Sequence, residues 1–90
     1  MLDMQHRAGK NLPQGNAAHA VASIAGLLGQ RTRDLRRQRG LTRRALADRA
    51  DVSERYLALL ESGSGNVSLL LLERIAHALN TRLSDLVAEP

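Results

Sequence analysis

Apolar residues in the second half of the chain recur at helical spacing, and no segment alternates apolar and polar residues as a strand would. The clearest segment follows Ser68, whose hydroxyl can cap a helix, and runs to Leu79, with Asn80 as a terminating residue. Its inward face is predicted to consist of Leu69, Leu72, Ile75, Ala76 and Leu79. A last short helix is predicted from Ser84 to Ala88, so the pattern indicates an all-α fold.

Capping residues mark two helices earlier in the chain. The segment from Gln30 to Arg39 consists of good helix formers, and Gly40 stands where a left-handed C-terminal cap is usual. Thr42 can cap the free amides of a second helix, which is predicted from Arg43 to Ala50.

A third helix is predicted to follow at once. Ser53 can cap it, Leu57 and Leu60 share one of its faces, and Gly63 supplies a stop after about Ser62. The second and third helices are therefore joined by a turn of only about three residues, a short connection even for packed helices.

The N-terminal part has a different composition. Residues 1–16 show no helical or strand period and are predicted to form a disordered arm. Residues 17–28 are small and apolar and predict a helical extension, although Gly26 and Gly29 weaken it. This extension either mediates dimerisation or packs on the domain, which is predicted to span residues 29–90.

The composition narrows the compartment and the class of protein. The chain has no cysteine, which removes disulfides and thiolate metal sites and gives no indication of secretion. It contains neither a run of about 18 apolar residues nor a signal peptide. We therefore expect a cytoplasmic domain with no membrane association.

Basic residues are concentrated in one stretch. The net charge is +4, and nine of the thirteen basic residues lie between Arg31 and Arg55 against four acidic ones. Nearly all are arginines, whose planar fork of donors binds phosphates and guanine edges. A single tyrosine without phenylalanine or tryptophan argues against stacking of single-stranded bases. The charge therefore favours a duplex partner, with a solvated helix surface as the alternative.

Two short helices joined by a tight turn form the motif that places a second helix in the major groove of DNA. The segment from Leu41 to Gly63 reads L-T-x-x-x-L-A-x-x-A-x-V-S-x-x-Y-L-x-x-L-E-x-G. It resembles the Cro/C1-type helix-turn-helix family, also called the xenobiotic response element family, and the resemblance extends from about Gly29 to Val87. The resemblance implies a compact five-helix, lambda-repressor-like domain whose third helix reads bases in a duplex operator.

The chain departs from the family pattern at three positions. Asp51 stands where the turn usually has glycine, and aspartate tolerates left-handed backbone better than most residues. Arg43 replaces the glutamine that usually opens the second helix and contacts a phosphate. Val67 replaces a proline before the fourth helix. Because an arginine is also a donor, we expect Arg43 to keep the phosphate contact of that glutamine, with altered geometry.

The third helix has an outward face opposite Leu57 and Leu60. We predict that this face contacts base edges through Glu54, Arg55, Ala58 and Leu59. Arg55 can pair with the O6 and N7 atoms of guanine, and Glu54 can accept a hydrogen bond from the amino group of cytosine. The alternatives are an exposed charge pair without a partner and, for Leu59, burial.

A second group of polar residues is predicted to contact phosphates, which fixes register without reading sequence. Its members are Thr42, Arg43, Arg44, Ser53, Tyr56, Ser64 and Asn66. The alternatives are that Thr42 and Ser53 serve only as caps and that the loop around Ser64 is a plain connection. Glu61 is expected to form an internal ion pair with a basic residue of the motif, since phosphate would repel it.

Four consecutive leucines, Leu69 to Leu72, cannot all face one core because successive helical residues are about 100° apart. Leu70 or Leu71 should meet the extension at 17–28, a second subunit or a further domain, with the extension preferred. The leucine run and its small-residue loop resemble the DNA-binding part of benzoyl-CoA-responsive regulators. That resemblance implies a small-molecule effector bound by a domain outside this chain.

Catalysis and metal binding find no support. His6, His19 and His77 are scattered, and the glycines near Ser64 lack the lysine of a nucleotide-binding loop. We expect no cofactor and no enzyme activity. The predicted function is that of a homodimeric transcriptional repressor, and the alternative is an antitoxin-like protein-interaction module with secondary DNA binding.

Overall fold

A computed structural model of the chain describes residues 14–64 and 66–88, and this part contains helices and no strand. The helices are α2 (Gln14–Gln38), α3 (Arg43–Ala50), α4 (Glu54–Glu61), α5 (Leu69–Ala78) and α6 (Leu83–Val87). The predicted all-α, five-helix fold is confirmed. Most of the predicted arm lies outside the described residues, but α2 already begins at Gln14.

Helix α2 is the main difference from the predicted elements. The sequence suggested an extension ending at Leu28 and a separate helix from Gln30, whereas α2 runs through both without a break. Gly29 does not end the helix. A Cβ atom there would overlap the backbone oxygen of Leu60 and lie 2.8 Å from that of Glu61, so the glycine lets α2 cross the end of α4 backbone to backbone.

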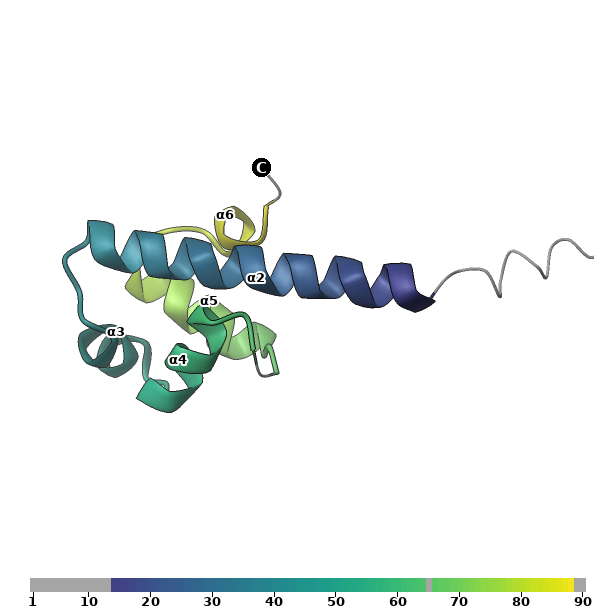
Figure 1. Cartoon of the computed structure of the whole chain (residues 1–90). Helices are drawn as coiled ribbons and strands as arrows, with labels where there is room; N and C mark the ends of the chain where they lie inside the picture. Colours follow the sequence, from purple (N-terminus) through teal and green to yellow (C-terminus); the bar gives the residue numbers. More distant parts are fainter. Residues whose placement is uncertain (1–13, 65, 89–90) are drawn as a thin grey trace, which may run out of the picture.

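The helices surround one core. Helix α2 packs against α4 and α6, while α5 packs against α3 and α6, and the N-terminal part of α2 projects beyond the other helices (Figure 1). Every helix contributes buried apolar side chains. They are Leu28, Leu46, Ala47, Ala50, Leu57, Leu60, Leu72, Ile75, Ala76, Leu79 and Leu86.

Left-handed residues end most of the helices as the sequence predicts. The φ angles are 67° at Gly40, 78° at Gly63 and 57° at Asn80. Each follows a helix whose last carbonyls need donors, and the left-handed turn supplies them. The amide of Leu41, for example, donates to the carbonyl of Arg36 at 3.0 Å.

Arg31 in α2 and Arg39, directly after its end, bind carbonyls at the C-terminal ends of other helices. Arg31 donates through Nη1 to the carbonyls of Asp85 and Leu86, at 3.3 and 3.4 Å. Arg39 donates through Nε to the carbonyl of Leu79 at 2.6 Å. Cations are favourable at these ends because the helix dipole is negative there. Part of the basic stretch therefore stabilises the fold.

The leucine run begins on the surface and ends in the core. Leu72 is buried, whereas Leu69 and Leu70 are 69% and 59% exposed. The prediction that Leu69 lies on the inward face is therefore wrong, because this first residue of α5 lies beyond the edge of the core. Of the two leucines predicted to meet α2 or another partner, Leu70 is exposed and Leu71 is half-buried. Among the described helices, none is both long and apolar enough to cross a membrane.

Candidate nucleic-acid interface

Helices α3 and α4 form the predicted helix-turn-helix, and its two caps are present. The Thr42 hydroxyl accepts a hydrogen bond from the amide of Ala45 at 3.0 Å, and the Ser53 hydroxyl accepts one from the amide of Tyr56 at 2.9 Å. Both residues are exposed. A hydroxyl that accepts a hydrogen bond keeps its own hydrogen, so each cap is still able to donate to a phosphate.

The turn between the helices depends on Asp51. Its φ and ψ of 57° and 49° are left-handed, as predicted for the position that usually carries glycine. The next amide, that of Val52, donates back to the carbonyl of Ala47 at 3.0 Å. Ala47 and Ala50 are both buried, so small side chains let the two helices pack closely.

The two faces of α4 differ in the way the sequence predicts. Leu57, Leu60 and Glu61 are buried. On the opposite face Glu54, Arg55 and Leu59 are exposed, and Ala58 is half-buried. Neither Glu54 nor Arg55 forms a hydrogen bond or ion pair with another described residue. The outward face therefore presents unengaged donors and acceptors.

Five of the seven predicted phosphate-contacting residues fall into two groups. Thr42, Arg43 and Arg44 lie exposed where α3 begins, and Ser64 and Asn66 lie exposed in the loop between α4 and α5. The amide of Ser64 is already engaged, because it donates to the carbonyl of Leu59 at 2.9 Å. Only its hydroxyl remains for a phosphate.

Tyr56 and Ser53 lie close in sequence but differ in their surroundings. Tyr56 is half-buried against the core, and its hydroxyl accepts a hydrogen bond from the amide of Ser68 at 3.2 Å. The tyrosine therefore ties α4 to the start of α5. Its hydroxyl hydrogen is the only donor that it could offer to DNA.

Glu61 has two arginine partners. Its side chain is only 1% exposed, and it accepts hydrogen bonds from Arg36 at 2.7 and 3.0 Å and from Nε of Arg43 at 3.0 Å. The predicted internal ion pair is confirmed. The hydrogen bond to Glu61 raises the pKa of Arg36, since the carboxylate stabilises the charged guanidinium. The sequence did not identify Arg36 as the partner, because nothing local links α2 to the end of α4.

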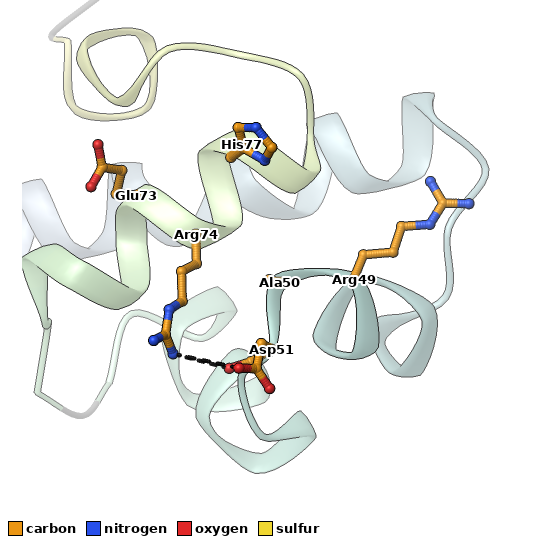
Figure 2. A pocket seen from close by; sticks show the side chains of 6 residues that line it. All are labelled: Arg49, Ala50, Asp51, Glu73, Arg74 and His77. Carbon is orange, nitrogen blue, oxygen red and sulfur yellow. Dashed lines mark hydrogen bonds and ion pairs between the residues drawn. The ribbon is translucent and has the colours of Figure 1, made fainter.

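A surface hollow between the end of α3 and α5 is shown in Figure 2. It is lined by Arg49, Ala50, Asp51, Glu73, Arg74 and His77. Arg74 donates to the Asp51 carbonyl at 3.3 Å and lies 4.0 Å from its carboxylate. Since the hollow carries charges of both signs, it shows no preference for an anion, and no metal-binding cluster occurs among the described residues.

Two sequence relatives each match about two thirds of the chain. This chain is 42% identical over 62 residues to the immunity repressor protein of Bacillus phage phi105. The matched segment covers 69% of this chain but only 43% of that repressor. This chain is also 36% identical over 61 residues to the HTH-type transcriptional regulator y4dJ of Sinorhizobium fredii, covering 68% of this chain and 79% of the regulator.

Solved structures show the same fold. The restriction-modification controller protein C.AhdI from Aeromonas hydrophila superposes with a TM-score of 0.69 at 33% identity, covering 71% of this chain and 97% of the controller. The clp gene regulator ClgR from Corynebacterium glutamicum superposes with a TM-score of 0.66 at 38% identity, covering 70% of this chain and 67% of ClgR.

The family assignment rests on the segment that contains all of the helix-turn-helix. Residues 33–86 match the family described as Helix-turn-helix, which is more than half of the chain. The match runs from the last turns of α2 to α6 and includes both caps, the left-handed turn and α4. The chain therefore belongs to the Cro/C1-type helix-turn-helix family of DNA-binding transcriptional regulators.

Proposed function

We propose that this domain binds a specific duplex operator as a homodimer and represses transcription. It would act in the cytoplasm by occupying the operator, without catalysing a reaction. The outward face of α4 carries this proposal. Its inward side chains are buried while Glu54 and Arg55 face solvent without partners among the described residues. A helix that presents such a face beside a second short helix is suited to the major groove.

Arg55 and Glu54 supply the proposed sequence preference. The guanidinium of Arg55 can donate to both acceptors of a guanine, and the carboxylate of Glu54 can accept from the amino group of a cytosine. Ala58 and Leu59 offer only apolar contact, which suits the methyl group of thymine. Leu59 is exposed and so is available for that contact.

The proposed affinity comes from the phosphate contacts. Arg43 and Arg44 begin α3, where the free amides and the helix dipole also favour an anion. Neutral side chains would add further donors, namely the hydroxyls of Thr42, Ser53, Tyr56 and Ser64 and the side-chain amide of Asn66. Such contacts fix the register of α4 in the groove and make binding strongly dependent on salt.

The names of the relatives agree with this proposal. They describe an immunity repressor, a restriction-modification controller and a clp gene regulator. The surface hollow between the end of α3 and α5 is open and carries charges of both signs, so we propose that any small-molecule effector binds to a part of the protein other than this hollow.

Selection of bound duplexes from a random pool tests the proposal. We expect one sequence family to be enriched and to bind at least about a thousandfold more tightly than scrambled duplexes. With that operator, Arg55→Ala should relax preference at one base pair by roughly 1–3 kcal/mol, whereas Arg44→Ala should weaken all duplexes alike and lower the salt slope by about 1. Equal weakening of all duplexes by both changes would show that Arg55 does not read a base.

The second candidate function is a protein-interaction module in which DNA binding is secondary. Three exposed apolar residues near the start of α5 favour it: Val67, Leu69 and Leu70. Exposed apolar patches of this kind mark protein contacts. If the selected duplex binds less than about tenfold more tightly than scrambled duplexes, this candidate is favoured. That ratio is far below the discrimination of a sequence-specific regulator.

A further inference from the structure

The cluster of Arg36, Arg43 and Glu61 joins three helices behind the proposed DNA-binding face. We propose that Glu61 is a positioning residue for backbone binding: its buried carboxylate fixes the Arg43 guanidinium so that both Nη groups are presented to one phosphate. This inference rests on the proposed function, because the anion concerned is the DNA backbone.

The geometry gives the two arginines different shares of the carboxylate. Arg36 binds it with two hydrogen bonds, Nε to Oε2 at 2.7 Å and Nη2 to Oε1 at 3.0 Å. Arg43 adds a single bond, Nε to Oε1 at 3.0 Å. Arg36 is buried, whereas the side chain of Arg43 is 44% exposed. Arg36 therefore neutralises the carboxylate inside the molecule, whereas Arg43 binds the same carboxylate from the surface.

A guanidinium that is bound at Nε keeps its two Nη groups for another ligand. Within the described residues, the Nη groups of Arg43 form no hydrogen bond. The planar fork of an arginine matches the oxygens of a phosphate, and a bidentate contact needs the plane to be oriented. Glu61 supplies that orientation because its carboxylate is buried and is itself held by two hydrogen bonds from Arg36.

The charge of the cluster also suits a phosphate. One carboxylate faces two guanidinium groups, so one positive charge remains uncompensated. Since Arg36 already neutralises Glu61, the positive charge of Arg43 is not compensated inside the molecule and can attract an anion. A half-exposed ion pair contributes little to stability, which leaves orientation as the main effect of the bond from Arg43.

Arg43→Lys separates orientation from charge and leaves the buried pair intact. Fluorescence anisotropy with the duplex selected by the wild-type protein, and with a scrambled duplex, should show about tenfold weaker binding to both, because lysine offers no fork. The salt slope should not change, since the charge is the same. The matched control is Arg49→Lys, which alters an exposed arginine of the same helix and should leave the affinity unchanged. Binding by Arg43→Lys within about twofold of wild type would overturn the inference.

A double-mutant cycle tests whether Glu61 acts through Arg43. Glu61→Gln should weaken binding about tenfold in the wild-type background and cause no further loss in the Arg43→Lys background. Equal losses in the two backgrounds would show that Glu61 affects DNA binding only through the fold, which would overturn its positioning role.

Nuclear magnetic resonance of the wild-type protein gives a result that does not depend on a folded variant. The Nε–H of Arg43 should exchange with solvent more slowly than that of Arg49, both in the free protein and on the selected duplex. Equally fast exchange would overturn the inference. If no duplex is selected at all, the proposed function fails, while this measurement still shows whether Glu61 orients Arg43.

Discussion

The arginines of α2 and those of the helix-turn-helix belong to one basic stretch of sequence, yet the molecule uses them differently. Arg31 and Arg36 in α2, and Arg39 directly after it, bind carbonyls or the buried Glu61 and so join this part of the chain to the other helices. Arg44 and Arg55 are exposed and form no hydrogen bond with described residues. The comparison teaches that a cluster of positive charge is a guide to DNA binding only after the arginines that are fully engaged inside the molecule are set aside. All three guanidinium nitrogens of Arg36 form hydrogen bonds, whereas Arg43 binds Glu61 through Nε alone.

The largest expected effect is that of removing an internal arginine. Arg36→Met leaves Glu61 with only its half-exposed partner, and loss of one member of a buried pair typically costs roughly 3–5 kcal/mol. Urea unfolding measures the loss. Arg37→Met, at an exposed neighbour in the same helix turn, should change the free energy of unfolding by less than about 0.5 kcal/mol. Similar losses for the two variants would contradict the distinction.

The crossing that brings α2 and its arginines against α4 should be almost as sensitive. Gly29→Ala places a methyl group into the backbone oxygens of Leu60 and Glu61, and we expect a loss of about 2–3 kcal/mol. Gly26→Ala is the control, since a Cβ atom there meets nothing within 4 Å. That change should raise stability by about 0.5–1 kcal/mol through better helix propensity. Thermal unfolding would contradict the account if both changes had the same sign.

A smaller effect is expected in the turn of the helix-turn-helix. Asp51→Gly should raise the free energy of unfolding by about 0.5–1 kcal/mol, because glycine adopts the left-handed backbone without strain. Asp48→Gly, in the interior of α3, should lower it by a similar amount. Denaturant unfolding of the pair measures the difference, and destabilisation by Asp51→Gly would mean that the aspartate side chain stabilises the turn.

The smallest effect should be on the outward face of α4. Arg55→Ala is expected to change the free energy of unfolding by less than about 0.5 kcal/mol, because the exposed side chain has no partner among the described residues. Urea unfolding beside Arg36→Met makes the comparison direct. A loss above about 1 kcal/mol would show that Arg55, like the arginines of α2, serves the fold.

Local signals in the sequence were enough to predict most of the elements. Thr42 and Ser53 cap their helices, and Gly40, Gly63 and Asn80 adopt the left-handed backbone that ends a helix. Each of these features depends on a few adjacent residues, so the printed sequence contains the whole cause. The same holds for the exposure of Arg55 and Glu54, which follows from the helical period of α4.

The sequence could not reveal features that depend on distant residues. Gly29 looks like a helix breaker until Leu60 and Glu61 are seen against it. Likewise, Glu61 is recognisable as a carboxylate that needs a cation, but nine basic residues nearby in sequence compete for that role. Which side chains contact bases or phosphates stays a prediction.

The crossing at Gly29 has a consequence for how such a domain can diversify. Because main chain rests on main chain there, the tilt of α4 is set by atoms that every residue type shares. Side chains on the solvent side of α4 can then be exchanged without changing the angle at which the helix is presented. One scaffold can thereby recognise many operators through substitution of a few residues on the solvent side of α4.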